Sequence, residues 1–179
     1  MEDPAKEESR QFHVRALVVG AWGYNLVFDD IRLTIGRSVE RDYGVSLEFT
    51  YDFEGSSMSA WERVQGSRYD IFFIDGGIDT AVKPGSLDGR TLSESLQEMY
   101  PSVPRVGMSG HPRYLERCLH CYDRVVGCSD LSAGTVAGIL SEFGMIPESL
   151  SDQEAKPEDE IDRLREDPKT GKVMEEEGF

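Results

Sequence analysis

The chain has 179 residues, a length that suits one domain of ordinary size with tails. Hydrophobic residues make up 39% of it and charged residues 30%, which is enough for a core beneath a polar surface. The net charge of −15 argues against nucleic acid as a partner, because phosphate backbones are bound through Lys and Arg. No run approaches the roughly 18 apolar residues of a membrane span, and the acidic N-terminus is unlike a signal peptide. We therefore expect a cytoplasmic protein that binds neither nucleic acid nor membrane.

Polar residues dominate both ends of the chain. Residues 146–179 carry twelve Asp and Glu against five Lys and Arg, and prolines interrupt them. A segment of this composition buries too little apolar surface to offset the entropy lost on ordering. The sequence therefore predicts a polar tail over 1–12, a folded domain over 13–145 and an acidic, disordered tail over 146–179.

Short apolar runs alternate with helical stretches along the predicted domain. The first run, residues 14–20, is rich in β-branched residues and ends in glycine, as buried parallel strands do. Gly44 suits the end of the helix that follows, and serines at 56 and 57 suit the start of the next one. We predict strands over 14–20, 45–51, 69–74, 105–108 and 124–127, and helices over 25–41, 56–64, 92–99, 112–120 and 131–143.

This alternation predicts an α/β fold. Five strands and five helices in turn, without hairpin signals, specify a parallel sheet that is covered on both faces. Right-handed crossovers make a doubly wound sheet the expected topology, and the second strand, which alternates most, is expected near an edge. Functional residues of such sheets lie in the loops at the carboxyl ends of the strands.

Three motifs in this pattern resemble the receiver domain of bacterial two-component response regulators, over residues 14–145. The run YDIFFID places Asp75 at the end of a central strand, where that family has its phosphoacceptor. The segment PGSLDG, residues 84–89, resembles the Pro-x-x-x-Asp-Gly segment that opens the family's third helix. The run VPRVGMSG brings Ser109 to the end of the fourth strand, where the family carries Ser or Thr. The resemblance implies a flavodoxin-like sheet with strand order 2-1-3-4-5.

Most residues that would complete phosphotransfer are missing from this sequence. Receivers hold Mg²⁺ through an acidic pair directly after strand one, because this ion takes carboxylate oxygens in octahedral geometry. Here Gly20 and Ala21 follow that strand, and Asp29 and Asp30 lie some two helical turns further on. The lysine that would stabilise the transferring phosphoryl group is replaced by Gly127.

Two other positions bear on the same pocket. The family's switch aromatic in strand five corresponds to Arg124, and the loop between Asp75 and Asp88 is longer than usual. Lys83 on that loop could fold back over Asp75, but we interpret it as a solvated loop residue. The resemblance thus implies a degenerate phosphoacceptor pocket, without metal or cofactor, that consists of Asp75, Ser109, Gly20, Ala21 and Gly127.

Three cysteines, Cys118, Cys121 and Cys128, lie close together in the sequence. Their odd number fits a reducing compartment and not a disulfide framework. The C-x-x-C pair, with His111 and His120 nearby, is at most half of a structural zinc site. We interpret the cysteines as buried packing residues, with metal binding and redox sensing as alternatives.

The loop GAWG, residues 20–23, has neither the glycine spacing nor the lysine of a phosphate-binding loop. Trp22 and Tyr24 could stack on a flavin in the strand-end cleft. We instead expect both aromatic side chains to pack over the vacated acidic pocket.

Taken together, these residues predict a non-enzymatic signalling module, a pseudo-receiver that acts by protein–protein interaction without Mg²⁺-dependent aspartyl phosphorylation. The expected partner is a histidine kinase or an output protein, docked on the fourth and fifth helices and strand five. The same face would serve for a homodimer. The alternatives are an atypical receiver weakly phosphorylated on Asp75, and a binder of flavin or another small molecule at the strand-end cleft.

Overall fold

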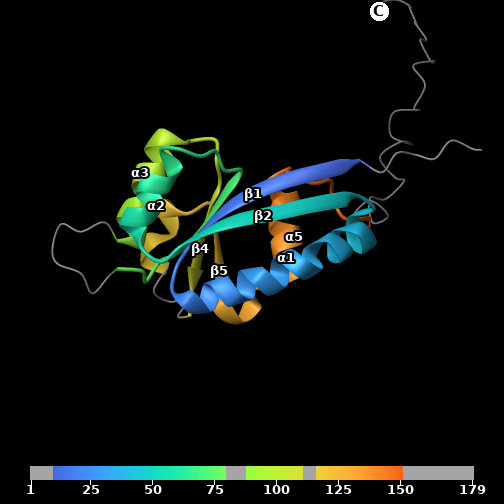
Figure 1. Ribbon diagram of the computed structural model, residues 1–179, viewed down its shortest axis with the longest axis horizontal. Helices are drawn as coiled ribbons and strands as arrows, with labels where there is room; N and C mark the ends of the chain where they lie inside the picture. The colour runs from blue at the N-terminus through green and yellow to red at the C-terminus, as the bar shows by residue number, and fades with distance from the viewer. Residues whose placement is uncertain (1–9, 80–87, 111–115, 151–179) are drawn as a thin grey trace, which may run out of the picture.

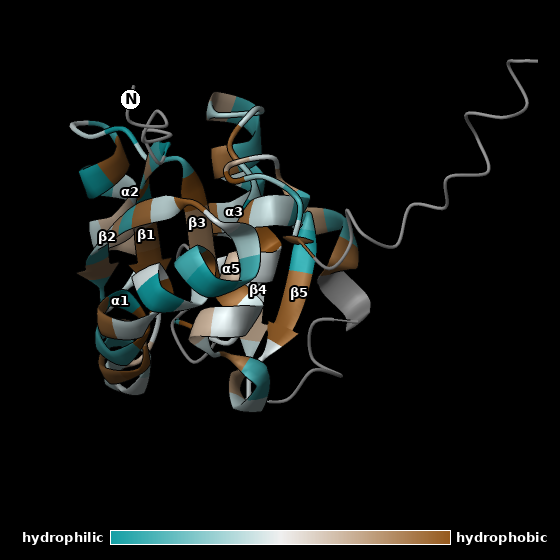
Figure 2. Ribbon diagram, turned by 90° about the vertical axis from the view of Figure 1, so that its right-hand side faces the viewer, coloured by the Kyte–Doolittle hydropathy of each residue, from teal (hydrophilic) through white to brown (hydrophobic). Residues whose placement is uncertain are grey.

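A five-stranded parallel sheet forms the centre of the computed structural model, which describes residues 10–79, 88–110 and 116–150. Its order is β2-β1-β3-β4-β5, and every neighbouring pair is parallel (Figure 2). The predicted strand order and the edge position of the second strand are confirmed. The strands are β1 (Gln11–Val19), β2 (Ser46–Glu54), β3 (Ile71–Asp75), β4 (Arg105–Ser109) and β5 (Arg124–Gly127).

Helices cover both faces of this sheet, with α1 and α5 on one face and α2 and α3 on the other (Figure 1). Ser56 caps α2, since its hydroxyl accepts the backbone N–H of Ser59 at 3.1 Å. Gly44 ends α1 in the left-handed conformation, with φ of 68°, as the sequence predicts. The helical elements are α1 (Trp22–Tyr43), α2 (Ser57–Val64), α3 (Gly89–Met99) and α5 (Ala133–Glu142), with the short 3₁₀ helices η1 (Glu116–Cys121) and η2 (Cys128–Asp130).

The sheet separates two hydrophobic clusters because successive strand residues point to opposite faces. Val18 and Phe73 pack beneath α1, whose buried face includes Phe28. Leu17 faces α3, where it joins Leu92. None of the helices in the described ranges is both long and apolar enough to span a membrane.

The first two strands are longer than predicted. They pair along their whole length, from Gln11 with Ser46 to the other end, whereas β3 joins β1 only from Ala16 onward. The last two residues of the N-terminal tail predicted over 1–12, Gln11 and Phe12, therefore belong to β1. Phe12, partly buried against the α1 cluster, accounts for this extension.

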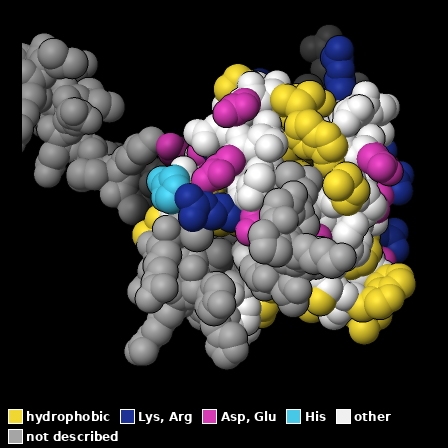
Figure 3. All heavy atoms as spheres, turned by 90° about the vertical axis from the view of Figure 1, so that its left-hand side faces the viewer, with side chains coloured by type: hydrophobic (Ala, Val, Ile, Leu, Met, Phe, Trp, Pro, Cys, Tyr) yellow, Lys and Arg dark blue, Asp and Glu magenta, His cyan; other side chains and the backbone are white. Residues whose placement is uncertain are grey.

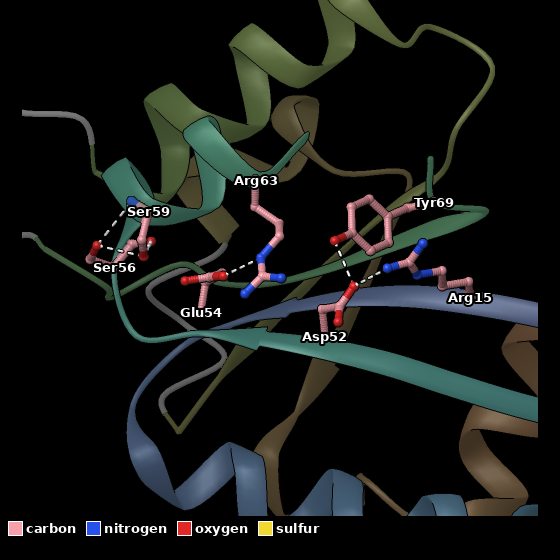
Figure 4. A network of polar contacts seen from close by, with 7 residues as sticks. All are labelled: Arg15, Asp52, Glu54, Ser56, Ser59, Arg63 and Tyr69. Carbon is pink, nitrogen blue, oxygen red and sulfur yellow. Dashed lines mark hydrogen bonds and ion pairs between the residues drawn. The ribbon is translucent and has the colours of Figure 1, made fainter. Parts of the chain in front are cut away.

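Charge pairing explains how β2 continues through acidic residues at which the sequence predicts its end (Figure 4). Asp52 accepts hydrogen bonds from Arg15 of β1 and from the Tyr69 hydroxyl, each at 2.7 Å. Glu54 accepts one from Arg63 of α2 at 2.5 Å. These contacts connect the edge strand to its neighbour and to the helix above it.

The helix bounds differ from the prediction. The first helix begins three residues earlier and ends two residues later than predicted, and α3 begins three residues earlier. Two other helices change more in character. The one predicted over 112–120 begins outside the described residues, and its described part is the 3₁₀ helix η1. The one predicted over 131–143 is shorter, because Ser132 caps α5 by accepting the N–H of Thr135 and the turn η2 precedes it. Local capping thus sets the start of the last helix.

Packing continues past residue 145. Ile146 is only 3% exposed and belongs to the α1 cluster. The Ser141 hydroxyl donates to the Pro147 carbonyl at 2.7 Å, and Leu150 approaches Gly44. The remainder of the predicted acidic tail, 151–179, lies outside the described residues.

Candidate functional site

The residues of the predicted pocket come together at the carboxyl edge of the sheet. Asp75 ends β3, Ser109 ends β4 and Gly127 ends β5, and the register places Ser109 beside Gly127. Gly20 directly follows β1, and a Cβ added to it would lie 3.3 Å from the Cβ of Asp75. Ser109 is almost fully buried, and Asp75 is half-buried.

Backbone N–H groups from two loops hold the Asp75 carboxylate. Gly77 donates to Oδ1 at 2.9 Å, and the N–H of Ala21 donates as well. Burial raises the pKa of this carboxyl, and the two donors offset only part of that effect. The carboxylate thus already has polar partners of its own.

Tyr24, in the first turn of α1, fills the space beside Asp75. Its side chain is 8% exposed, and its Cδ2 would lie 2.7 Å from a Cβ on Gly20. Its hydroxyl makes a 2.6 Å hydrogen bond with Sγ of Cys128. Burial, this hydrogen bond and the negative charge of Asp75 all raise the pKa of the phenol, so it stays neutral.

The expectation that both aromatic residues pack over the pocket is therefore right for Tyr24 and wrong for Trp22. Trp22 is 73% exposed and stacks on Phe53, with ring centroids 5.4 Å apart and planes 13° from parallel. Tyr24 lies on the same face of the helix as the buried residue Phe28, four positions later. Trp22 lies on another face of the helix and stays in solvent. The flavin alternative depended on both rings, and the Tyr24 ring is packed against the protein itself.

The described residues do not fit the Mg²⁺ site of a receiver. Tyr24 leaves no room for a carboxylate side chain at position 20. Asp29 pairs with Arg32 at 3.6 Å, and Asp79 accepts the Ser57 backbone N–H at 2.7 Å. Within residues 10–79, 88–110 and 116–150, three metal-ligating side chains meet in one group only, on α3 and η1. Asp75 is not part of that group.

The start of α3 matches the family's Asp-Gly segment. Asp88 caps the helix by accepting the N–H of Thr91 at 2.8 Å. Gly89 lies so close to the backbone carbonyl of Asp75 that a Cβ there would overlap it. The rest of the motif, residues 84–87, and Lys83 lie outside the described residues.

The remaining candidates lie in β5 and in the short 3₁₀ helices on either side of it in the sequence. Arg124 pairs with Glu142 of α5 at 3.5 Å, and both side chains are about half exposed. Cys121 is buried and Cys128 partly buried, which agrees with packing roles. His111 and the side chain of Cys118 lie outside the described residues. Sequence reasoning missed the link between Tyr24 and Cys128, because no local signal joins residues so far apart.

Several solved structures to which this chain is similar are receiver domains. A receiver domain of a sensor histidine kinase from Pseudomonas aeruginosa, with magnesium in its active-site cleft, superposes with a TM-score of 0.56 and 14% identity, over 73% of this chain and 97% of that one. The response regulator TrrA from Thermotoga maritima gives 0.53 and 14%, over 73% and 98%. The receiver domain of an HD-domain protein from Pseudomonas fluorescens gives 0.53 and 17%, over 80% and 99%.

No protein-family model matches the sequence, and no curated protein matches it. At these identities the likeness concerns the fold. The sheet order 2-1-3-4-5 and the placement of the helices are those of receivers. The chain therefore has the flavodoxin-like fold of response-regulator receiver domains.

Proposed function

We propose that this protein is a non-enzymatic signalling module, a pseudo-receiver that acts by binding other proteins without Mg²⁺-dependent phosphorylation of Asp75. One observation carries the proposal: the ring of Tyr24 packs against Gly20 beside Asp75, where a receiver needs an acidic side chain. Related structures that contain magnesium, or magnesium with beryllofluoride, share the fold. Here Asp75 belongs to no group of three metal-ligating side chains among the described residues.

The chemistry of aspartyl phosphorylation explains why these differences matter. A phosphoryl group carries negative charge toward a carboxylate, and metal ions and cations must neutralise that charge in the transition state. At the end of β5, Gly127 provides no such cation. A raised pKa also leaves less of the Asp75 carboxylate ionised at a given pH. Both differences lower the rate at which Asp75 would accept a phosphoryl group.

A constitutive partner face fits the far end of the sheet. In place of a switch aromatic, Arg124 pairs with Glu142, which joins β5 to α5 in one arrangement. Exposed pairs of this kind add little stability, about 0–1 kcal/mol, and leave the charged groups available to a partner. We propose that a cytoplasmic histidine kinase or output protein docks on η1, β5 and α5, and that a homodimer would use the same face.

The arrangement of Asp75 and Ser109 favours one second candidate. Both residues end neighbouring strands, as they do in the receiver pattern. An atypical receiver that is weakly phosphorylated on Asp75 would retain this pair. The two candidates differ in whether any phosphoryl group reaches the carboxylate.

Treatment with acetyl phosphate and Mg²⁺, followed by intact mass spectrometry, separates them. We expect no phosphoryl adduct under conditions that modify a functional receiver assayed in parallel. Asp75→Asn serves as the matched control, because it removes the acceptor and keeps the shape of the side chain. An adduct that forms on the unaltered protein and disappears in Asp75→Asn would overturn the proposal in favour of the weakly phosphorylated receiver.

A further inference from the structure

Three different metal-ligating groups meet on the side of the sheet opposite Tyr24. Glu94 comes from α3, and His120 and Cys121 come from η1. Figure 3 views this end of the molecule and shows histidine, acidic and basic side chains side by side on its surface. The carboxylate, imidazole and thiol ligand atoms all lie within 4.8 Å of one another.

Two of the separations are close to those of ligands around one small divalent ion. Oε1 of Glu94 lies 3.4 Å from Sγ of Cys121 and 3.8 Å from Nε2 of His120. Tetrahedral Zn²⁺ with bonds of about 2.0–2.3 Å places its ligand atoms about 3.3–3.6 Å apart. The imidazole of His120 lies within 4.8 Å of Sγ of Cys121, and rotation of this exposed side chain would complete the coordination.

A buried hydrogen bond already joins the two elements that carry the ligands. The hydroxyl of Ser93, which is fully buried, donates to the carbonyl of Cys121 at 2.5 Å. This bond ties η1 to α3 immediately beside Glu94. Cys121 is itself fully buried, whereas the side chain of His120 is 64% exposed and free to rotate toward the other two. Because the two elements are already joined, the site loses less entropy when it binds an ion than separate elements would.

The charges also suit a cation. Oε1 of Glu94 accepts hydrogen bonds from Arg90 and from the Cys121 thiol, so a carboxylate oxygen faces the other ligands. Arg90 contacts Oε1 at 3.0 Å, but its side chain is half exposed and such a pair contributes only about 0–1 kcal/mol. A carboxylate has lone pairs for both an arginine and a metal ion. The thiol of Cys121 would release its proton to solvent on binding.

We propose that Glu94, His120 and Cys121 bind one Zn²⁺ ion, with water as the fourth ligand. This combination of sulfur, nitrogen and oxygen ligands selects zinc over magnesium or calcium, which take oxygen ligands. The bound ion would cross-link α3 to the 3₁₀ helix that leads into β5. The inference is independent of the proposed signalling function, and it departs from the expectation that the cysteines serve packing alone.

Zinc titration of the full chain in competition with a chromophoric chelator tests this site. We expect one ion per chain, and an affinity at least tenfold lower in Glu94→Gln and in His120→Ala. With Co²⁺ in place of zinc, the unaltered protein should show thiolate-to-metal charge-transfer absorption that Cys121→Ser removes. Cys128→Ser is the matched control, because that cysteine contacts Tyr24 on the opposite side of the sheet.

The two exposed ligands keep the test decisive even though Cys121→Ser alters a buried residue and can impair folding. Circular dichroism should show Glu94→Gln and His120→Ala folded as the unaltered protein is. Absence of stoichiometric zinc binding would overturn the proposal. So would an affinity that Glu94→Gln and His120→Ala leave unchanged, or one that depends on Cys118→Ser or Cys128→Ser in place of Glu94→Gln.

Discussion

A single methyl group on Gly20 would show how tightly Tyr24 fills the strand-end pocket. In Gly20→Ala the new Cβ would lie 2.7 Å from Cδ2 of Tyr24 and 3.3 Å from its Cε2. Carbon atoms prefer separations of about 3.5–4.0 Å, so either the ring or the strand must move. The backbone of Gly20 lies outside the left-handed region, and the expected cost comes from the ring contact.

The size of this effect follows from how the ring is held. Tyr24 is 8% exposed, and its hydroxyl is bonded to Cys128, so the ring cannot swing into solvent without losing both contacts. Overpacking of this kind costs about 1–3 kcal/mol. Replacing glycine by alanine also restricts the unfolded chain, which returns about 0.4–1 kcal/mol. We expect Gly20→Ala to lower the free energy of unfolding by about 1–2 kcal/mol.

Urea unfolding followed by circular dichroism measures this cost in two backgrounds. In Tyr24→Ala the ring is absent, and the cost of Gly20→Ala should vanish, giving a coupling energy of about 1 kcal/mol or more. Gly55→Ala is the control, because no atom lies within 4 Å of a Cβ there. A cost no larger than that of the control, or equal with and without Tyr24, would refute the account of the pocket.

Three further changes test neighbouring parts of the structure. Asp123→Ala would remove the carboxylate that binds the guanidinium of Arg105, whose side chain is only 4% exposed. We expect the free energy of unfolding measured in urea to fall by about 3 kcal/mol. A fall below about 1 kcal/mol would contradict this. Burial raises the pKa of Asp75, so the folded state binds more protons than the unfolded state between their two pKa values, and stability falls as pH rises through that window. Asp75→Asn should therefore stabilise the protein at neutral pH, with a gain that shrinks toward about pH 4 in melting experiments. Tyr24→Phe should lower the free energy of unfolding by about 1 kcal/mol. Adding Cys128→Ala to that variant should lower it little further, because the two side chains share one hydrogen bond.

The sheet could be predicted from the sequence because its signals are local. Buried parallel strands consist of apolar runs, and their alternation with helices leaves few topologies. Gly44 and Ser56 mark helix ends through their own backbone and side-chain chemistry, without help from distant residues. Asp75 is also marked locally, because it directly follows the buried apolar residues of β3.

Features that depend on distant partners could not be predicted in this way. Asp52 and Glu54 look like loop residues in the sequence. In the structure they continue a strand, where Arg15, Tyr69 and Arg63 pair with them. Whether the ring of Trp22 or of Tyr24 is buried depends on which face of α1 packs on the sheet. No capping side chain marks where this helix begins.

The proposed Zn²⁺ ligands are a similar case. Glu94 and Cys121 are 27 residues apart, and the packing of η1 on α3 brings them together. The C-x-x-C spacing marks one of these residues in the sequence, but it does not indicate the carboxylate.

Mg²⁺ titration monitored by amide NMR tests the central claim most directly. The N–H groups of Ala21 and Gly77 donate to the Asp75 carboxylate, so their signals report any ion that binds there. We predict no saturable shift of either signal in the low-millimolar range, because Asp75 belongs to no group of three metal-ligating side chains among the described residues. A saturable shift of both signals that Asp75→Asn abolishes would show a working metal site and contradict the pseudo-receiver account.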